Sequence, residues 1–228
     1  EILTPGEGRI RALIVSGGNP AVAFPNHELT LEALADLELL VVIDYRMTPT
    51  AEFADYVIAP TLALERADVP HLMDRWFREP YTNYTDPVVE RDGDVLNEWE
   101  VFWELASRLG STLPLPGGSP DMTTRPSTDE IIERSYAGSR MPLDEVRANR
   151  RKVHPDLRLV VEPADPSCTT KFTPAPDDLM DELAALLAEP APMLGDIDVT
   201  AYPFRLVSRR LKHVLNSTGT ELPGLARK

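Results

Sequence analysis

Two short apolar runs constrain this fold more than any other feature, because each ends abruptly in residues that suit a ligand. The first run, residues 11–16, stops at Gly17-Gly18-Asn19-Pro20, and the second, residues 39–43, stops at Asp44. Neither run alternates polar and apolar residues, which is typical of strands covered on both faces of a parallel sheet. A strand-helix-strand unit of this kind presents its strand ends to a nucleotide.

The residues between and after these runs predict the rest of an α/β layer. Leucine and alanine recur at helical spacing over residues 28–37, so a helix joins the two strands. A short helix with proline in its first turn is expected over residues 48–55, and a third strand over residues 56–59. Three strands with two crossovers predict a Rossmann-like fold, a parallel sheet with flanking helices.

The next part of the chain predicts loops, a hairpin and a helix. Residues 62–90 are rich in aromatic side chains without a sustained period, which favours long loops. The Asp-Gly pair at residues 92–93 lies between two apolar runs and predicts a hairpin. Asn97 with Glu100 is the pattern of a capping box, and Gly110 ends the apolar stripe that follows.

Proline-rich breaks separate the remaining elements. Residues 111–126 predict a linker or surface excursion. The expected elements after it are helices over 127–137, 143–151 and 177–189, and strands over 157–162 and 202–208. A basic cluster of four residues lies near the carboxyl end of the helix expected over residues 143–151, where positive charge interacts favourably with the helix dipole. It comprises Arg147, Arg150, Arg151 and Lys152. These breaks predict three regions, at 1–110, 111–198 and 199–228, the last a domain that is cut off almost at once.

Composition excludes several classes of function. The 37 acidic residues outnumber the 23 Lys and Arg, and a net charge of −14 argues against binding to nucleic acid or an anionic membrane. The single cysteine, Cys168, cannot form an intrachain disulfide or hold a metal cluster alone. This cysteine usage favours a cytoplasmic protein. No window approaches the roughly 18 apolar residues of a membrane helix, so we expect no membrane insertion by this chain. The four histidines lie in no known catalytic motif; they are His27, His71, His154 and His213.

The glycine turn and Asp44 form the strongest candidate site. Backbone N–H groups at the carboxyl end of a strand suit a diphosphate, and a carboxylate offers two acceptors to a ribose diol or to the guanine edge. The pattern G-x-G-x-x-G of nicotinamide and flavin domains is absent. The same residues also fit a plain turn and a helix cap, so the pattern alone leaves both interpretations open.

Three motifs together resemble the molybdopterin oxidoreductases of the dimethyl-sulfoxide-reductase family. They are residues 12–20, residues 41–51 and residues 54–60 with Glu65. Residues 204–210, with His213 and Asn216, are similar to the start of that family's C-terminal dinucleotide-binding domain, which is of β-barrel type. The resemblance implies that a bis(molybdopterin guanine dinucleotide) cofactor, carrying molybdenum or tungsten, lies against the strand ends.

The resemblance also implies a role for each matched residue. The glycine turn would approach the nucleotide part of one cofactor, Asp44 would bind its guanine, and Thr61 would lie near the same nucleotide. Ile43 stands where the family often has glutamine, so that contact is lost. The residues expected at the cofactor are Gly17, Gly18, Asn19, Asp44 and Thr61, with Ser208, Arg209, His213 and Asn216 reaching pterin or phosphate groups.

The chain lacks what family members carry before this region, namely a cysteine motif for a 4Fe-4S cluster and the ligand of the metal. It begins with Glu1 rather than Met, and we expect an internal portion of a longer enzyme, inactive alone, with its catalytic metal ligand elsewhere. Expected partners are the remaining polypeptide and an iron-sulfur electron-transfer subunit. The alternatives are a homologue that keeps the fold without the cofactor, like the large iron-sulfur subunit of respiratory NADH dehydrogenase, and a generic dinucleotide domain.

Overall fold

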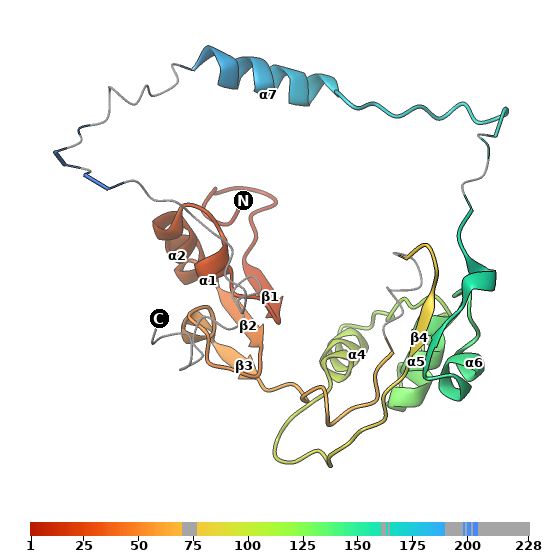
Figure 1. Ribbon diagram of the computed structural model, residues 1–228. Helices are drawn as coiled ribbons and strands as arrows, with labels where there is room; N and C mark the ends of the chain where they lie inside the picture. Colours follow the sequence, from red (N-terminus) through yellow and green to blue (C-terminus); the bar gives the residue numbers. More distant parts are fainter. Residues whose placement is uncertain are drawn as a thin grey trace. The chain divides into compact units, whose positions relative to one another are not determined.

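The protein is described by a computed structural model, which covers residues 1–69, 77–160, 163, 165–189, 198, 200–201 and 203–204 (Figure 1). The chain divides into two compact units, Glu1–Val160 and Val161–Lys228. The sequence-derived region boundaries at 110 and 198 stay predictions.

A three-stranded parallel sheet forms the first part of the larger unit. Its strands are β1 (Ala12–Ser16), β2 (Leu39–Ile43) and β3 (Tyr56–Ile58), in the order β1-β2-β3 (Figure 1). The register pairs each residue of β1 with the residue 27 positions later, as in Ala12 with Leu39. The predicted strands and their parallel arrangement are confirmed.

Short helices cover one face of this sheet. They are α1 (Pro20–Ala23), α2 (His27–Ala35) and the 3-10 helix η1 (Ala51–Phe53). The helix predicted over residues 28–37 is confirmed as α2, whereas the one predicted over 48–55 is a single 3-10 turn. The core between helices and sheet consists of buried aliphatic side chains: Ala21, Leu34, Leu40, Val42 and Ala51.

The hairpin predicted around residues 92–93 is wrong. Leu96 pairs in parallel with Pro60, beyond the end of β3, and the backbone N–H groups of Val88 and Val89 both donate to the carbonyl of Leu64. The two apolar runs therefore satisfy their backbone groups with distant segments rather than with each other. Gly93, at φ +80°, still makes the turn that the Asp-Gly pair indicated.

Helix α4 (Glu98–Arg108) has the predicted capping box: the Asn97 side chain accepts from the backbone of Glu100, and the Glu100 side chain accepts from the Asn97 N–H. Glu100 is buried and also pairs with Arg91 and Arg125, at 3.1 and 3.4 Å. Gly110 follows the helix at φ +65°, as its sequence position indicated. The buried carboxylate thus joins the helix to the segments before and after it.

The rest of the larger unit contains helices α5 (Thr128–Tyr136) and α6 (Leu143–Ala148) and a two-stranded antiparallel sheet, β4 (Tyr81–Asn83) with β5 (Arg151–Val153). The serine cap of α5 is confirmed, since Ser127 accepts from the Glu130 N–H. The core here is formed by Val69, Tyr84, Ile132, Tyr136, Met141 and Val146.

Two further predictions in this region need correction. Residues 81–83, expected in loops, form β4, and the strand expected over 157–162 lies instead at β5, followed by the 3-10 helix η2 (Pro155–Leu157). The pairing of β4 with β5 joins distant segments, so no local pattern reveals it. Of the basic cluster only Arg147 lies in the last turn of α6, and it pairs with Asp129 and Glu133 of α5.

The smaller unit contains the predicted amphipathic helix as α7 (Asp177–Ala188), which buries none of its residues (Figure 1). The strand predicted over 202–208 falls almost wholly outside the described residues, and the β-barrel-type domain stays a prediction. Among the described residues, no helix combines the length and apolar character that a membrane span requires.

Candidate functional site

The carboxyl ends of the three parallel strands meet along one edge of the sheet. Hydrogen bonds continue past the strands there: Gly17 N–H donates to the Ile43 carbonyl at 2.9 Å, and Asp44 N–H to the Ile58 carbonyl at 3.2 Å. The parallel register thus brings the glycine turn beside Asp44, although 27 residues separate them along the chain. Both belong to the set that the sequence predicts at the cofactor.

The glycine turn presents backbone donors. Gly17 adopts φ +61°, a left-handed conformation that glycine adopts without strain. The Asn19 carbonyl accepts from Val22 and Ala23 and so begins α1. Within the described part of the chain, the backbone N–H groups of Gly18 and Asn19 donate to no acceptor. Two unpaired donors at the end of a strand favour an anionic ligand.

Asp44 is 8% exposed, and one of its carboxylate oxygens, Oδ1, accepts from the Arg46 N–H at 3.1 Å. This is a local turn bond rather than a helix cap, since η1 begins seven residues later, with Thr50 as its N-cap residue. In the described structure the second oxygen, Oδ2, accepts no hydrogen bond. Among the described residues, the carboxylate therefore keeps one acceptor oxygen without a donor.

Thr61 lies at the start of the segment after β3 and is 4% exposed. Its hydroxyl donates to Asn97 Oδ1 at 2.8 Å, so its side chain links this segment to the start of α4. A direct contact from Thr61 to a nucleotide stays a prediction.

Two charged residues that the sequence did not indicate also lie here. Glu98, the first residue of α4, accepts from the Ser16 hydroxyl at 3.0 Å and faces Arg66 at 3.7 Å. Arg66 in turn donates to the Thr61 carbonyl at 3.3 Å. Because 82 residues separate Ser16 from Glu98, no local motif could have paired them.

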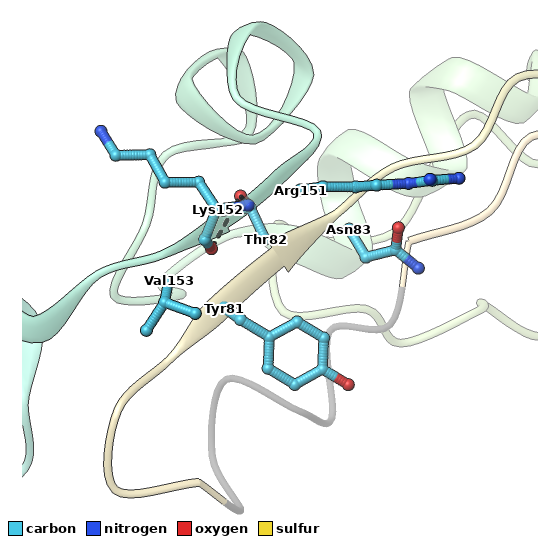
Figure 2. A pocket seen from close by; sticks show the side chains of 6 residues that line it. All are labelled: Tyr81, Thr82, Asn83, Arg151, Lys152 and Val153. Carbon is cyan, nitrogen blue, oxygen red and sulfur yellow. Dashed lines mark hydrogen bonds between the residues drawn. The ribbon is translucent and has the colours of Figure 1, made fainter.

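Cavities lie beside this cluster. Two of them, of about 310 and 260 Å³, share the lining residues Arg66, Ala67, Asn97 and Thr128. A third, of about 230 Å³, lies over β4 and β5, where Figure 2 shows Tyr81, Asn83 and Arg151 beside Thr82 and Lys152. It includes none of the predicted cofactor residues, and Thr82 is there hydrogen-bonded to the Lys152 backbone.

The predicted cofactor contacts of the last region fall outside the described residues; they are Ser208, Arg209, His213 and Asn216. Across the described ranges, His, Cys, Asp and Glu side chains form no group of three or more suited to a metal.

Comparison with known proteins gives a consistent match for the N-terminal half of the chain. Residues 2–108 match the family model described as molybdopterin oxidoreductase. The probable oxidoreductase YyaE of Bacillus subtilis is 33% identical over 110 residues, 48% of this chain and 16% of that protein. Acetylene hydratase of Syntrophotalea acetylenica is 34% identical over 101 residues, 44% of this chain and 13% of that protein.

Formate dehydrogenase H of Escherichia coli is 31% identical over 103 residues, covering 45% of this chain and 14% of that protein. Among solved structures, acetylene hydratase from Pelobacter acetylenicus aligns with a TM-score of 0.50 and 28% identity, over 64% of this chain and 19% of that one. The chain therefore spans less than a fifth of the length of these relatives.

Proposed function

Because the chain belongs, through residues 2–108, to the molybdopterin oxidoreductase family, we propose that it holds the nucleotide tail of a bis(molybdopterin guanine dinucleotide) cofactor. The full-length protein would be a molybdenum or tungsten oxidoreductase. The single observation that carries the proposal is that backbone N–H groups without acceptors and a buried carboxylate lie at the same edge of the sheet, among the described residues.

The residues present fit the nucleotide part of such a cofactor. A guanine base offers the N1–H and N2–H2 donors, which suit an acidic acceptor, and Asp44 keeps a free oxygen. A diphosphate offers acceptors only, which suit the free N–H groups of Gly18 and Asn19. Donors and acceptor therefore lie at the ends of two neighbouring strands, β1 and β2.

This chain would bind and orient the nucleotide tail of the cofactor, while the reaction would take place at the metal. When bound, the cofactor supplies a metal that changes oxidation state and pterins that conduct electrons. Asp44 would fix the guanine end, and the glycine turn would fix the diphosphate, so that the reactive end is held rigidly. Arg66 and Glu98 would brace the loop ends of β1 and β3 around it.

We further propose that the full-length protein carries a 4Fe-4S cluster and the ligand of the metal in other segments, and that it passes electrons to an iron-sulfur partner. In the last region, Ser208, Arg209, His213 and Asn216 would reach pterin or phosphate groups. The relatives include an acetylene hydratase, a formate dehydrogenase and a dimethyl sulfoxide/trimethylamine N-oxide reductase, so the proposal names no substrate.

Calorimetric titration of the chain with GDP and with ADP tests the proposal directly. We expect GDP to bind more tightly, because adenine presents an acceptor at N1 where guanine presents a donor to Asp44. Equal affinities for the two nucleotides, or no binding of either, would count against the guanine assignment. In the full-length protein, Asp44→Ala should lower molybdenum or tungsten content, and unchanged metal content would contradict the proposal.

A further inference from the structure

Thr50 is fully buried, at 0% exposure, and its hydroxyl joins two turns of the candidate site. The Ala21 N–H donates to Thr50 Oγ1 at 3.1 Å, and Thr50 Oγ1 lies 2.7 Å from Asn19 Oδ1. The Thr50 N–H also points to Asn19 Oδ1, at 3.3 Å. The predicted cofactor residue Asn19 is thus held by a residue that no cofactor prediction included.

The hydrogen-bond chemistry decides which way the Asn19 amide faces. The Thr50 hydroxyl can accept twice and donate once, so its bond from the Ala21 N–H does not by itself set the direction of its proton. The backbone N–H of Thr50, which points to the same Asn19 atom, sets that direction. The Thr50 N–H can only donate. Two donors aimed at one atom require that atom to be the amide oxygen, which settles the orientation of the amide group.

The amide nitrogen, Nδ2, then faces away from Thr50. Within the described structure it donates to no acceptor, and neither do the backbone N–H groups of Gly18 and Asn19. Three donor groups without partners therefore gather at the carboxyl end of β1. A side chain held in place before the ligand arrives loses less conformational freedom on binding.

We propose that Thr50 is a positioning residue: its hydroxyl and N–H turn the Asn19 amide so that Nδ2 donates to the diphosphate of the bound nucleotide. The inference rests on the proposed function, because it assumes a guanosine diphosphate unit at this edge. It adds that affinity for the diphosphate depends on a buried hydroxyl that never touches it.

The test compares GDP with guanosine, which share the base and differ in the diphosphate. In Thr50→Val the shape is kept and the hydroxyl is lost, so the Asn19 amide loses its shorter hydrogen bond. We expect GDP affinity to fall by about 5- to 10-fold, the range that one hydrogen bond supports, while guanosine affinity is unchanged. Thr50→Ser, which keeps the hydroxyl, should retain the GDP affinity of the unmodified chain.

Thr82→Val is the matched control. Thr82 is also buried, at 3% exposure, and its hydroxyl donates to the Asn149 carbonyl and accepts from the Lys152 N–H in the sheet of β4 and β5. Its loss should lower stability, measured by chemical unfolding, without changing the ratio of GDP to guanosine affinity. That ratio separates a positioning role from general destabilisation.

A measurement on the unmodified chain keeps the inference testable if Thr50→Val does not fold. The side-chain amide NMR signal of Asn19 should shift with GDP and stay in place with guanosine. The role of Thr50 would be overturned if the Asn19 signal did not shift with GDP, or if Thr50→Val lost GDP affinity and guanosine affinity equally. Neither result would contradict the nucleotide site itself. If the unmodified chain binds neither ligand, the proposed function falls and this inference with it.

Discussion

The hydroxyl of Thr50 and the side-chain oxygen of Asn19 lie 2.7 Å apart, although 31 residues separate them in the chain. The bond joins the turn after β1 to the segment that leads into η1. Together with the bond from the Ala21 N–H, it links the turn after β1 to the segment between Asp44 and η1. The candidate site is therefore shaped by side-chain hydrogen bonds between loops.

Asp44→Asn should remove guanine recognition with little loss of stability. Asparagine retains an acceptor for the Arg46 N–H but loses the charge and replaces the free oxygen with a donor. We expect GDP affinity to fall by about 10- to 100-fold, since a hydrogen bond to a charged group contributes about 1.5–3 kcal/mol. Calorimetric titration measures this change.

Asp55→Asn is the control for that prediction. Asp55 also accepts from a backbone N–H, that of Leu40 at 2.7 Å, but it lies before β3 rather than after a strand. Its substitution should lower the unfolding temperature and leave GDP affinity unchanged. Equal losses of affinity in the two variants would show that Asp44 has no specific role.

Glu100→Gln should destabilise the larger unit. The carboxylate is buried and has ion-pair contacts with Arg91 and Arg125. Among the described residues, glutamine leaves Arg91 without an anionic partner and leaves Arg125 with Glu104 alone, at 3.6 Å. We expect a loss of about 2 kcal/mol in the free energy of unfolding, measured with denaturant. Glu104→Gln, on the same helix but more exposed, should cost clearly less, because solvent screens its ion pairs with Arg108 and Arg125. A loss as large at Glu104 would contradict this ranking.

Gly17→Ala and Gly18→Ala separate backbone strain from steric space. Gly17 has φ +61° with open space where a Cβ would lie, so alanine there should cost about 1 kcal/mol through strain alone. Gly18 has no positive φ, and its added Cβ would meet Val15 at 3.4 Å, an ordinary contact. Thermal unfolding should therefore rank Gly17→Ala as the less stable variant, and the reverse order would contradict the turn geometry.

Glu38 links stability to acid pH. The hydrogen bond from Arg11 lowers the pKa of the Glu38 carboxyl below its ordinary value. A folded pKa below the unfolded one means that the stabilisation is present above the unfolded pKa, about 4.3, and is lost as pH falls through the folded pKa. The unfolding temperatures of the unmodified chain and Glu38→Gln should therefore converge on acidification.

Glu28→Gln controls for the removal of an acidic residue, since Glu28 has no ion-pair partner among the described residues. Its difference from the unmodified chain should not follow the pH course of Glu38→Gln. Because the Arg11–Glu38 pair is exposed, added salt should also reduce the Glu38 effect. A Glu38 effect that persists below both pKa values would contradict the assignment.

Elements set by neighbouring residues could be predicted from the sequence. The apolar runs at β1 and β2, the box formed by Asn97 with Glu100, and the Ser127 cap all depend on contacts within a few residues. The carboxyl ends of parallel strands lie at the same edge of a sheet, so the sequence also predicted that Gly17 and Asp44 lie close together. Their binding to a nucleotide stays a prediction.

The sequence by itself thus determined the three parallel strands, the capped helices α4 and α5, and the turn residues at the sheet edge, because periodicity, capping and turn chemistry act locally. Only the tertiary structure decided that Leu96 pairs with Pro60 instead of closing a hairpin, and that Glu98 meets Ser16. It alone shows that Thr50 fixes the Asn19 amide. These contacts join segments far apart in the chain, and their partners are chosen by packing, which no local pattern records.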